Sequence, residues 1–128
     1  MIDTTEIQQR VGRKNELPVP LVPLERLAWN YWWSWAADGE SVFRDLDPEI
    51  WEECERNPRQ LLARTSSYRL AEAATDRVYL ERVRRLDESF QTYLTSPPRL
   101  HQDAITPEHP VAYFCAEFGV HTSLPLYS

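Results

Sequence analysis

The chain has 128 residues, of which 42% are hydrophobic and 12% aromatic, and its formal charge is −6 at pH 7. This length fits one ordinary domain, or one small domain and the beginning of a second. The acidic balance argues against binding to nucleic acid. No window of the sequence approaches the roughly 18 apolar residues of a membrane span. Since the N-terminus also shows no signal peptide, we expect a cytoplasmic protein.

Residues 1–23 are predicted to form a flexible, extended lead. Residues 1–16 are polar without a clear hydrophobic period, and the sequence Leu-Pro-Val-Pro-Leu-Val-Pro follows over 17–23. Three prolines in so short a stretch are typical of the polyproline conformation. We therefore expect residues 17–23 to lie extended across the helical body that follows.

A first helix is predicted from Leu24 to about Ala37. At 100° per residue its apolar side chains cover about 240° of the circumference, so it must be nearly surrounded by other parts of the protein. Gly39 lies just past its end, where glycine commonly stops a helix. The helix contains four tryptophans: Trp29, Trp32, Trp33 and Trp35. They either pack a core, which their spread around the helix favours, or stack on sugar rings as a glucan platform.

Two shorter helices have clear starts. Asp47-Pro48 and Asn57-Pro58 each place a capping side chain directly before a proline at the first helical position. These steps predict helices over 48–56 and 58–64.

The last two helices also begin at capping residues. Ser66 or Ser67 is expected to cap a short helix, and Asp76 a long one that runs to about Leu94. Apolar side chains recur along the long helix in steps of four and three residues, which makes one stripe suited to packing against the tryptophan-rich helix. The stripe consists of Tyr79, Val83, Leu86, Phe90 and Tyr93.

The charged residues of these helices are interpreted as solvated surface. The acidic run of Glu49, Glu52, Glu53 and Glu55 is balanced by Arg56, Arg59 and the helix N-terminus. The basic set of Arg82, Arg84 and Arg85 alternates with Glu81, Asp87 and Glu88. We expect salt-bridged helix faces rather than acid–base pairs or a phosphate clamp.

The chain has no zinc-ligand spacing, nucleophile elbow or glycine-rich phosphate loop. Its single lysine, Lys14, is the only candidate for a Schiff base. Cys54 and Cys115 form no CxxC pair and are interpreted as reduced structural thiols. We therefore predict no catalytic, cofactor-binding or metal-ligating residue in this chain.

Residues 96–110 are predicted to be a proline-rich linker, followed by the beginning of a second fold. Residues 111–115 are uncharged, aromatic and β-branched, as in a strand of a parallel sheet buried on both faces. Glu117, Gly119 and His121 follow the strand, and open α/β sheets bind ligands at the carboxyl ends of their strands. Too few residues remain for a crossover and a partner strand. The predicted fold class is therefore mainly α, with a helical domain over 24–95 and the first strand of a truncated α/β domain over 111–128.

Two stretches in series resemble a known family. The run Ala112-Tyr-Phe-Cys-Ala-Glu-Phe-Gly-Val-His-Thr-Ser-Leu-Pro-Leu-Tyr-Ser128 resembles the start of the catalytic region of bacterial and archaeal α-glucan (glycogen/maltodextrin) phosphorylases. The upstream runs Leu24-Glu-Arg-Leu-Ala-Trp-Asn-Tyr-Trp-Trp-Ser-Trp35 and Leu46-Asp-Pro-Glu-Ile-Trp-Glu-Glu-Cys54 resemble the helical domain of uncharacterised role that precedes that region.

The resemblance implies a parent glycosyltransferase with two Rossmann-like halves of the GT-B type. Such enzymes use pyridoxal 5'-phosphate and inorganic phosphate to release glucose 1-phosphate from α-1,4-glucans. After the Tyr-Ser that matches Tyr127-Ser128, the family continues into a Gly-Gly-Leu-Gly loop. The resemblance implies substrate-binding roles for Glu117, near the glucosyl site, and for Phe118, Gly119 and His121, which shape the turn. The cofactor lysine lies far toward the family's C-terminus, so we expect this chain to bind no cofactor.

Two functions remain open at this point. The chain is either the structural and inactive N-terminal part of a phosphorylase, with the rest of the catalytic domain as its partner, or a free-standing helical module that binds glucan or another protein. In the isolated chain, residues 111–115 would have no sheet partner, and an unpaired apolar strand invites aggregation.

Overall fold

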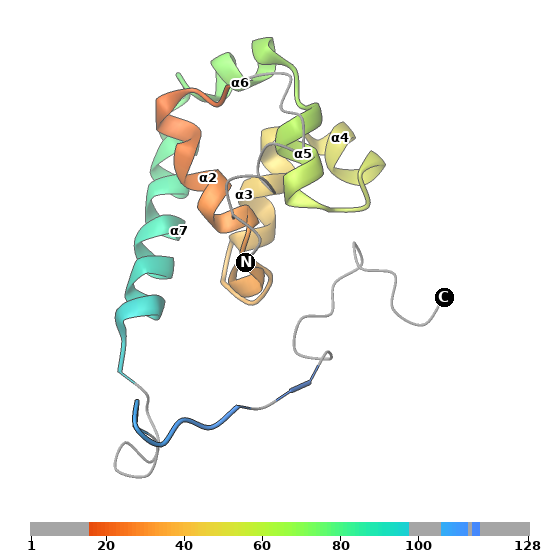
Figure 1. Cartoon of the computed structure of the whole chain (residues 1–128). Helices are drawn as coiled ribbons and strands as arrows, with labels where there is room; N and C mark the ends of the chain where they lie inside the picture. Colours follow the sequence, from red (N-terminus) through yellow and green to blue (C-terminus); the bar gives the residue numbers. More distant parts are fainter. Residues whose placement is uncertain (1–15, 98–105, 113, 116–128) are drawn as a thin grey trace.

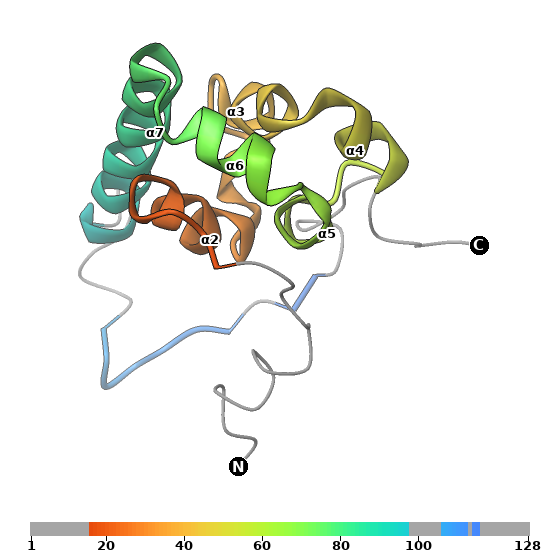
Figure 2. The same ribbon diagram turned by 90° about the horizontal axis from the view of Figure 1, so that it is seen from above.

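The computed structural model describes residues 16–97, 106–112 and 114–115, and the helices lie in the first of these ranges. The elements are η1 (Val19–Leu21), α2 (Val22–Ala28), η2 (Tyr31–Ser34), α3 (Gly39–Leu46), α4 (Pro48–Glu53), α5 (Pro58–Arg64), α6 (Ser67–Ala73) and α7 (Arg77–Thr95). Figure 1 shows α2 alongside the long α7, with α3 to α6 completing a small bundle, and Figure 2 shows the same neighbours from above. The predicted mainly helical character is confirmed.

The proline-rich stretch over 17–23 is not extended as predicted. Residues Val19–Leu21 form a 3-10 turn, and Val22 begins α2. Pro20 is the second residue of the first element, and Pro23 is the second residue of the other. Proline fits a helix start because its missing N–H would have no partner there, and its fixed φ is already helical. The prolines therefore begin two helical segments here.

The single helix predicted over 24–37 is also wrong. The chain leaves helical geometry at Asn30, whose backbone is extended at φ −127° and ψ 131°, and the Asn30 side chain accepts a hydrogen bond from the Trp32 N–H at 2.9 Å. An asparagine that caps the next turn competes with the continuing helix. The break separates α2 from η2 and divides the tryptophans between them.

Gly39 begins a helix that the sequence analysis did not predict, instead of ending one. Asp38 before it has a left-handed backbone with φ 63°, and α3 then runs from Gly39 to Leu46. A Cβ on Gly39 would lie 1.9 Å from the Trp33 carbonyl oxygen, so only glycine fits between these two turns. The tight approach folds α3 back against η2.

The later helices follow their predicted caps. Side chains of Asp47, Asn57, Ser66 and Asp76 each accept backbone N–H hydrogen bonds at the starts of α4, α5, α6 and α7. The prediction for α5 is confirmed at both ends. Helix α4 ends at Glu53 rather than Arg56, because Glu55 and Arg56 both have left-handed backbones.

The core is built around aromatic rings. Trp33, Phe43 and Trp51 are fully buried and in mutual contact, with ring centroids 5.4, 6.0 and 6.1 Å apart. On α7 the predicted stripe is buried from Tyr79 to Phe90, while Tyr93 is exposed. The Tyr79 hydroxyl donates to the Val42 carbonyl at 2.9 Å, which ties α7 to α3.

No strand is present among the described residues of 111–115. Val111 is 70% and Phe114 94% exposed, so the predicted burial on both faces is not observed. A strand exists only where it pairs with another, and the described residues supply no partner sheet. An isolated bridge between Thr106 and His109 is the β-type pairing found in the described part of the chain. Whether 111–128 begins a GT-B domain therefore remains a proposal.

We expect Gly39→Ala to destabilise the protein by at least about 2 kcal/mol, since the added methyl group collides with the rigid Trp33 backbone. The measurement is urea denaturation followed by circular dichroism. The neighbouring change Glu40→Ala, at an exposed site of the same helix, is the control and should stay within about 0.5 kcal/mol. Equal midpoints for the two variants would contradict this account of the turn.

We expect Tyr79→Phe to lower stability by about 1 kcal/mol, because it removes one buried hydrogen bond. Tyr68→Phe is the matched control, since Tyr68 is 80% exposed. Burial also raises the pKa of the Tyr79 hydroxyl well above its usual range. The pKa of tyrosine in the unfolded chain is about 10, and a group whose pKa is higher in the native state stabilises the fold at pH values below that unfolded pKa. This stabilisation is lost as the pH rises above it. Wild type should therefore lose more stability above pH 10 than Tyr79→Phe; parallel losses would contradict this.

Candidate functional site

The site residues predicted from the sequence, Glu117, Phe118, Gly119 and His121, lie outside the described residues, so their roles stay predictions. In the part of the chain that the structure describes, no three histidine, cysteine or acidic side chains come together to hold a metal ion. Lys14 also lies outside that part. A candidate site must therefore come from other features of the helical bundle.

The five tryptophans divide into three groups. Trp33 and Trp51 are buried in the core, which confirms the packing interpretation for them. Trp32 is half-buried, with its ring centroid 5.3 Å from Phe90 and 6.0 Å from Tyr93. Trp29 and Trp35 are 45% and 63% exposed. Two large rings thus remain on the surface.

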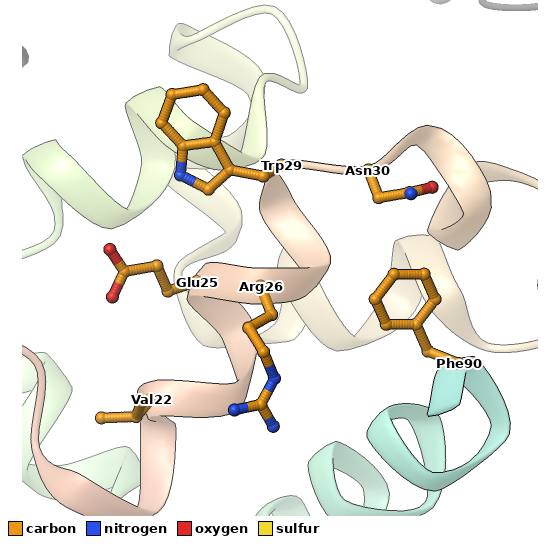
Figure 3. Close-up of a pocket in the computed structure, with 6 residues that line it drawn as sticks. All are labelled: Val22, Glu25, Arg26, Trp29, Asn30 and Phe90. Carbon is orange, nitrogen blue, oxygen red and sulfur yellow. The ribbon is translucent and has the colours of Figure 1, made fainter. Parts of the chain in front are cut away.

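Trp29 lines a groove of about 410 Å³ between α2 and α7. Its walls are Val22, Glu25, Arg26, Trp29, Asn30 and Phe90, which Figure 3 shows as sticks. Four of these residues, at 22, 25, 26 and 29, follow the three- and four-residue spacing of one helix face. We call this the Trp29 groove. The same spacing is visible in the sequence, but the break at Asn30 that opens the groove is not.

A second pocket of about 190 Å³ is also lined by Trp29, together with residues that include Tyr31, Asn57 and Arg59. The Arg59 guanidinium carbon lies 3.6 Å from the Trp29 ring centroid. Such cation–π contacts contribute about 0.5–1 kcal/mol at exposed sites. Arg59, predicted to balance the acidic run, therefore stacks on Trp29 and fixes its ring.

The polar groups of the Trp29 groove are also held in place. The Arg26 guanidinium donates to Asp87 Oδ2 on α7 at 2.7 Å. The Asn30 Oδ1 accepts from the Trp32 N–H, which leaves its amide nitrogen as a remaining donor. Guanidinium, carboxylate and amide groups thus border one exposed aromatic ring.

Several of the other charges form solvated ion pairs, as predicted for Arg56, Arg84 and Arg85. Arg56 pairs with Glu52 at 3.4 Å, and Arg64 with Glu53 at 2.6 Å. On α7, Glu81 accepts from Arg84 and Arg85, and these bonds lower the pKa of its carboxyl group to about 2. Exposed pairs of this kind contribute little to stability.

The cysteines and the helices add no further site among the described residues. Cys54 and Cys115 are free thiols, and burial raises the pKa of the Cys54 thiol, which makes it a poor nucleophile. Among the described helices, none combines the length and apolar character needed to cross a bilayer.

Comparison with known proteins supports the resemblance. The model of a family described as "Protein of unknown function (DUF3417)" matches residues 17–124. The chain is 37% identical over 117 residues, 90% of its length, to a maltodextrin phosphorylase of Thermococcus litoralis, and 36% identical over 126 residues to a glycogen phosphorylase of Mycobacterium tuberculosis. A glycogen phosphorylase of Aquifex aeolicus is 29% identical over 105 residues. The chain spans only 14–15% of the length of these curated relatives. No solved structure gives a significant match.

We expect Arg59→Met to shift the NMR resonance of the Trp29 indole N–H, because the guanidinium no longer covers that ring. Stability should fall by about 0.5–1 kcal/mol. The signals of the other indoles should move little. Arg77→Met, at an exposed arginine of α7, is the control and should leave every indole signal in place. An unmoved Trp29 signal in Arg59→Met would contradict the stacking.

Proposed function

We propose, since this chain belongs to the DUF3417 family, that it is the N-terminal region of an α-glucan phosphorylase and serves that enzyme as a structural domain. The observation that carries the proposal is 36–37% identity to two proteins named as phosphorylases over 90–94% of this chain. The match includes the helical region and reaches residues that resemble the start of the catalytic region.

The parent reaction would transfer a glucosyl group from an α-1,4-glucan to inorganic phosphate. A phosphate oxygen bonds to the anomeric carbon, the glycosidic C–O bond breaks, and the departing 4-oxygen gains the proton that the phosphate loses. Glu117, with Phe118, Gly119 and His121, would border the glucosyl site. We place this parent in the cytoplasm.

The cofactor of the parent has no place among the described residues. Pyridoxal phosphate binds enzymes as a Schiff base on lysine, and the described residues include no lysine. The helical bundle also lacks a glycine-rich turn for the phosphate, since Gly39 is buried against Trp33. No step of the chemistry is therefore assigned to this chain's helices.

The helical bundle has exposed apolar side chains suited to packing on the rest of the enzyme. Trp35 follows η2, and Tyr93 and Leu94 lie in the last turn of α7; all three are more than half exposed. Helix α7 is the last of the described helices and ends at Thr95, so a domain that follows in sequence would be tethered near this end. Exposed apolar side chains next to a tether favour an interdomain contact. We call these three residues the docking face.

The pure chain is expected to release no glucose 1-phosphate from maltodextrin and phosphate, because it holds neither a cofactor lysine nor a phosphate loop. A coupled assay for glucose 1-phosphate measures this. The reading frame after the Ser128 codon should continue, directly or after a frameshift, into Gly-Gly-Leu-Gly and a phosphorylase catalytic region. Turnover by the pure chain, or a stop codon with no such sequence downstream, would overturn the proposal.

The docking face is tested by co-expressing this chain with the polypeptide encoded after Ser128. We expect the two to purify together, and we expect Trp35→Asp combined with Leu94→Asp to reduce recovery about tenfold by placing charges in an apolar contact. Tyr68→Asp is the control, since Tyr68 is also exposed but lies on α6. Undiminished recovery of the double variant would show that the docking face is not the contact.

A further inference from the structure

We infer that the Trp29 groove is a non-catalytic binding site for a neutral oligosaccharide, namely the glucan chain on which the parent enzyme acts. The site would lie on the helical bundle and hold the polymer away from the reacting bond. The choice of an α-1,4-glucan rests on the proposed function, whereas the sugar-binding character rests on the groove itself.

The first argument is the state of the Trp29 ring. Trp29 lines both the Trp29 groove and the second pocket, whose lining includes Arg59. Arg59 stacks on the ring at 3.6 Å, and the side chain is still 45% exposed. In Figure 3 the indole extends from the end of α2, and Glu25 lies on the preceding turn of that helix. An accessible aromatic face of this kind stacks against the C–H groups of a sugar ring.

The second argument is the mixture of polar groups at the groove. Sugar hydroxyls both donate and accept hydrogen bonds, so a sugar site needs both kinds of partner. Glu25 supplies acceptors, and the guanidinium of Arg26 and the amide of Asn30 supply donors. Val22 and Phe90 add apolar surface. A few fixed polar groups on a largely apolar wall are typical of a small-molecule site.

The third argument is charge. The two carboxylates at the groove, Glu25 and Asp87, are balanced by two guanidinium groups. Arg26 pairs with Asp87, and Arg59 stacks on Trp29. Neither an anion such as a nucleotide nor a cation would find an excess of opposite charge there. The balance therefore favours a neutral ligand over a phosphate ester or a basic peptide.

The fourth argument is preorganisation. Arg59 holds the Trp29 ring, Asp87 holds Arg26, and the Trp32 N–H holds Asn30, all without ligand. Groups fixed in advance lose little conformational entropy on binding. Because the groove is open and shallow, affinity should still be weak, with Kd of about 1 mM for a short glucan.

The test is a titration of the 128-residue chain with maltoheptaose, followed by the five tryptophan indole N–H resonances in two-dimensional NMR spectra. We expect the Trp29 signal to shift with saturation, while those of buried Trp33 and Trp51 stay in place. Cellohexaose, with β-1,4 linkages, should bind at least about fivefold more weakly. Equal affinities for the two sugars would overturn the assignment to an α-glucan.

Three variants locate the site. Trp29→Ala should weaken binding about tenfold or more, and Trp29→Phe, which keeps a smaller ring, by less. Trp35→Ala is the matched control: it removes another exposed tryptophan, which does not line the groove, and should leave binding unchanged. The indole signals of the remaining tryptophans report whether each variant is folded, and Trp29→Phe keeps the test valid if Trp29→Ala unfolds.

The outcomes separate this inference from the proposed function. No shift of the Trp29 signal up to about 10 mM maltoheptaose, ten times the expected Kd, overturns the groove as a glucan site. So does loss of binding in Trp35→Ala with binding retained in Trp29→Phe. Either result leaves the proposed function standing, because that proposal is tested by the sequence after Ser128 and by the expected lack of phosphorolysis by the pure chain. Conversely, saturable binding at Trp29, together with a stop codon after Ser128 and no phosphorylase sequence downstream in any frame, would retain the sugar site and remove the phosphorylase assignment.

Discussion

The contact among Trp33, Phe43 and Trp51 is the constraint on which the rest of this structure depends. These fully buried rings come from η2, α3 and α4 and join the three elements in one cluster. Burial of each ring contributes roughly 2–3 kcal/mol, and edge-to-face contacts add to it. The Trp51 indole N–H finds no acceptor among the described residues, so ring packing rather than hydrogen bonding holds it. Gly39 makes the cluster possible, since any side chain there would push η2 away from α3.

This constraint also explains why Trp29 faces outward. If residues 24–37 formed a continuous helix, Trp29 and Trp33 would be one turn apart on the same face, and both would enter the core or both would leave it. The extended backbone at Asn30 breaks that relation. Trp33 turns into the aromatic cluster, while Trp29 stays at the end of α2 under Arg59. The exposed ring is therefore a consequence of how the core is filled.

The sequence predicts the second half of the bundle much better than the first. Caps such as Asp47 and Asn57 act locally, through one side chain and the next two or three backbone N–H groups, so they can be read from a few residues. The break at Asn30 and the role of Gly39 depend on Trp33, which packs against residues far along the chain. Apolar periodicity is uninformative where nearly every side chain is apolar, as over 24–37. The prediction of a buried strand at 111–115 was not confirmed for a related reason. A strand needs a partner, and sequence alone does not say whether that partner is present. For the candidate site, the sequence shows the helical spacing of residues 22 to 29, but it does not predict that Arg59 stacks on Trp29.

The Trp29 groove and the docking face make different demands on the parent enzyme. The docking face consists of apolar residues without fixed polar partners, at the end of α7 where the chain departs, and burial suits such a surface. The groove instead borders its ring with charged and amide groups that already have partners, so covering it with protein would desolvate them for little gain. The two surfaces are both near the C-terminal half of α7, since Phe90 lines the groove and Tyr93 belongs to the docking face. A catalytic domain seated on the docking face would thus lie beside the groove without needing to fill it. A polymer held at the groove would then pass close to that domain, and this arrangement would give a small helical domain a use beyond covering apolar surface.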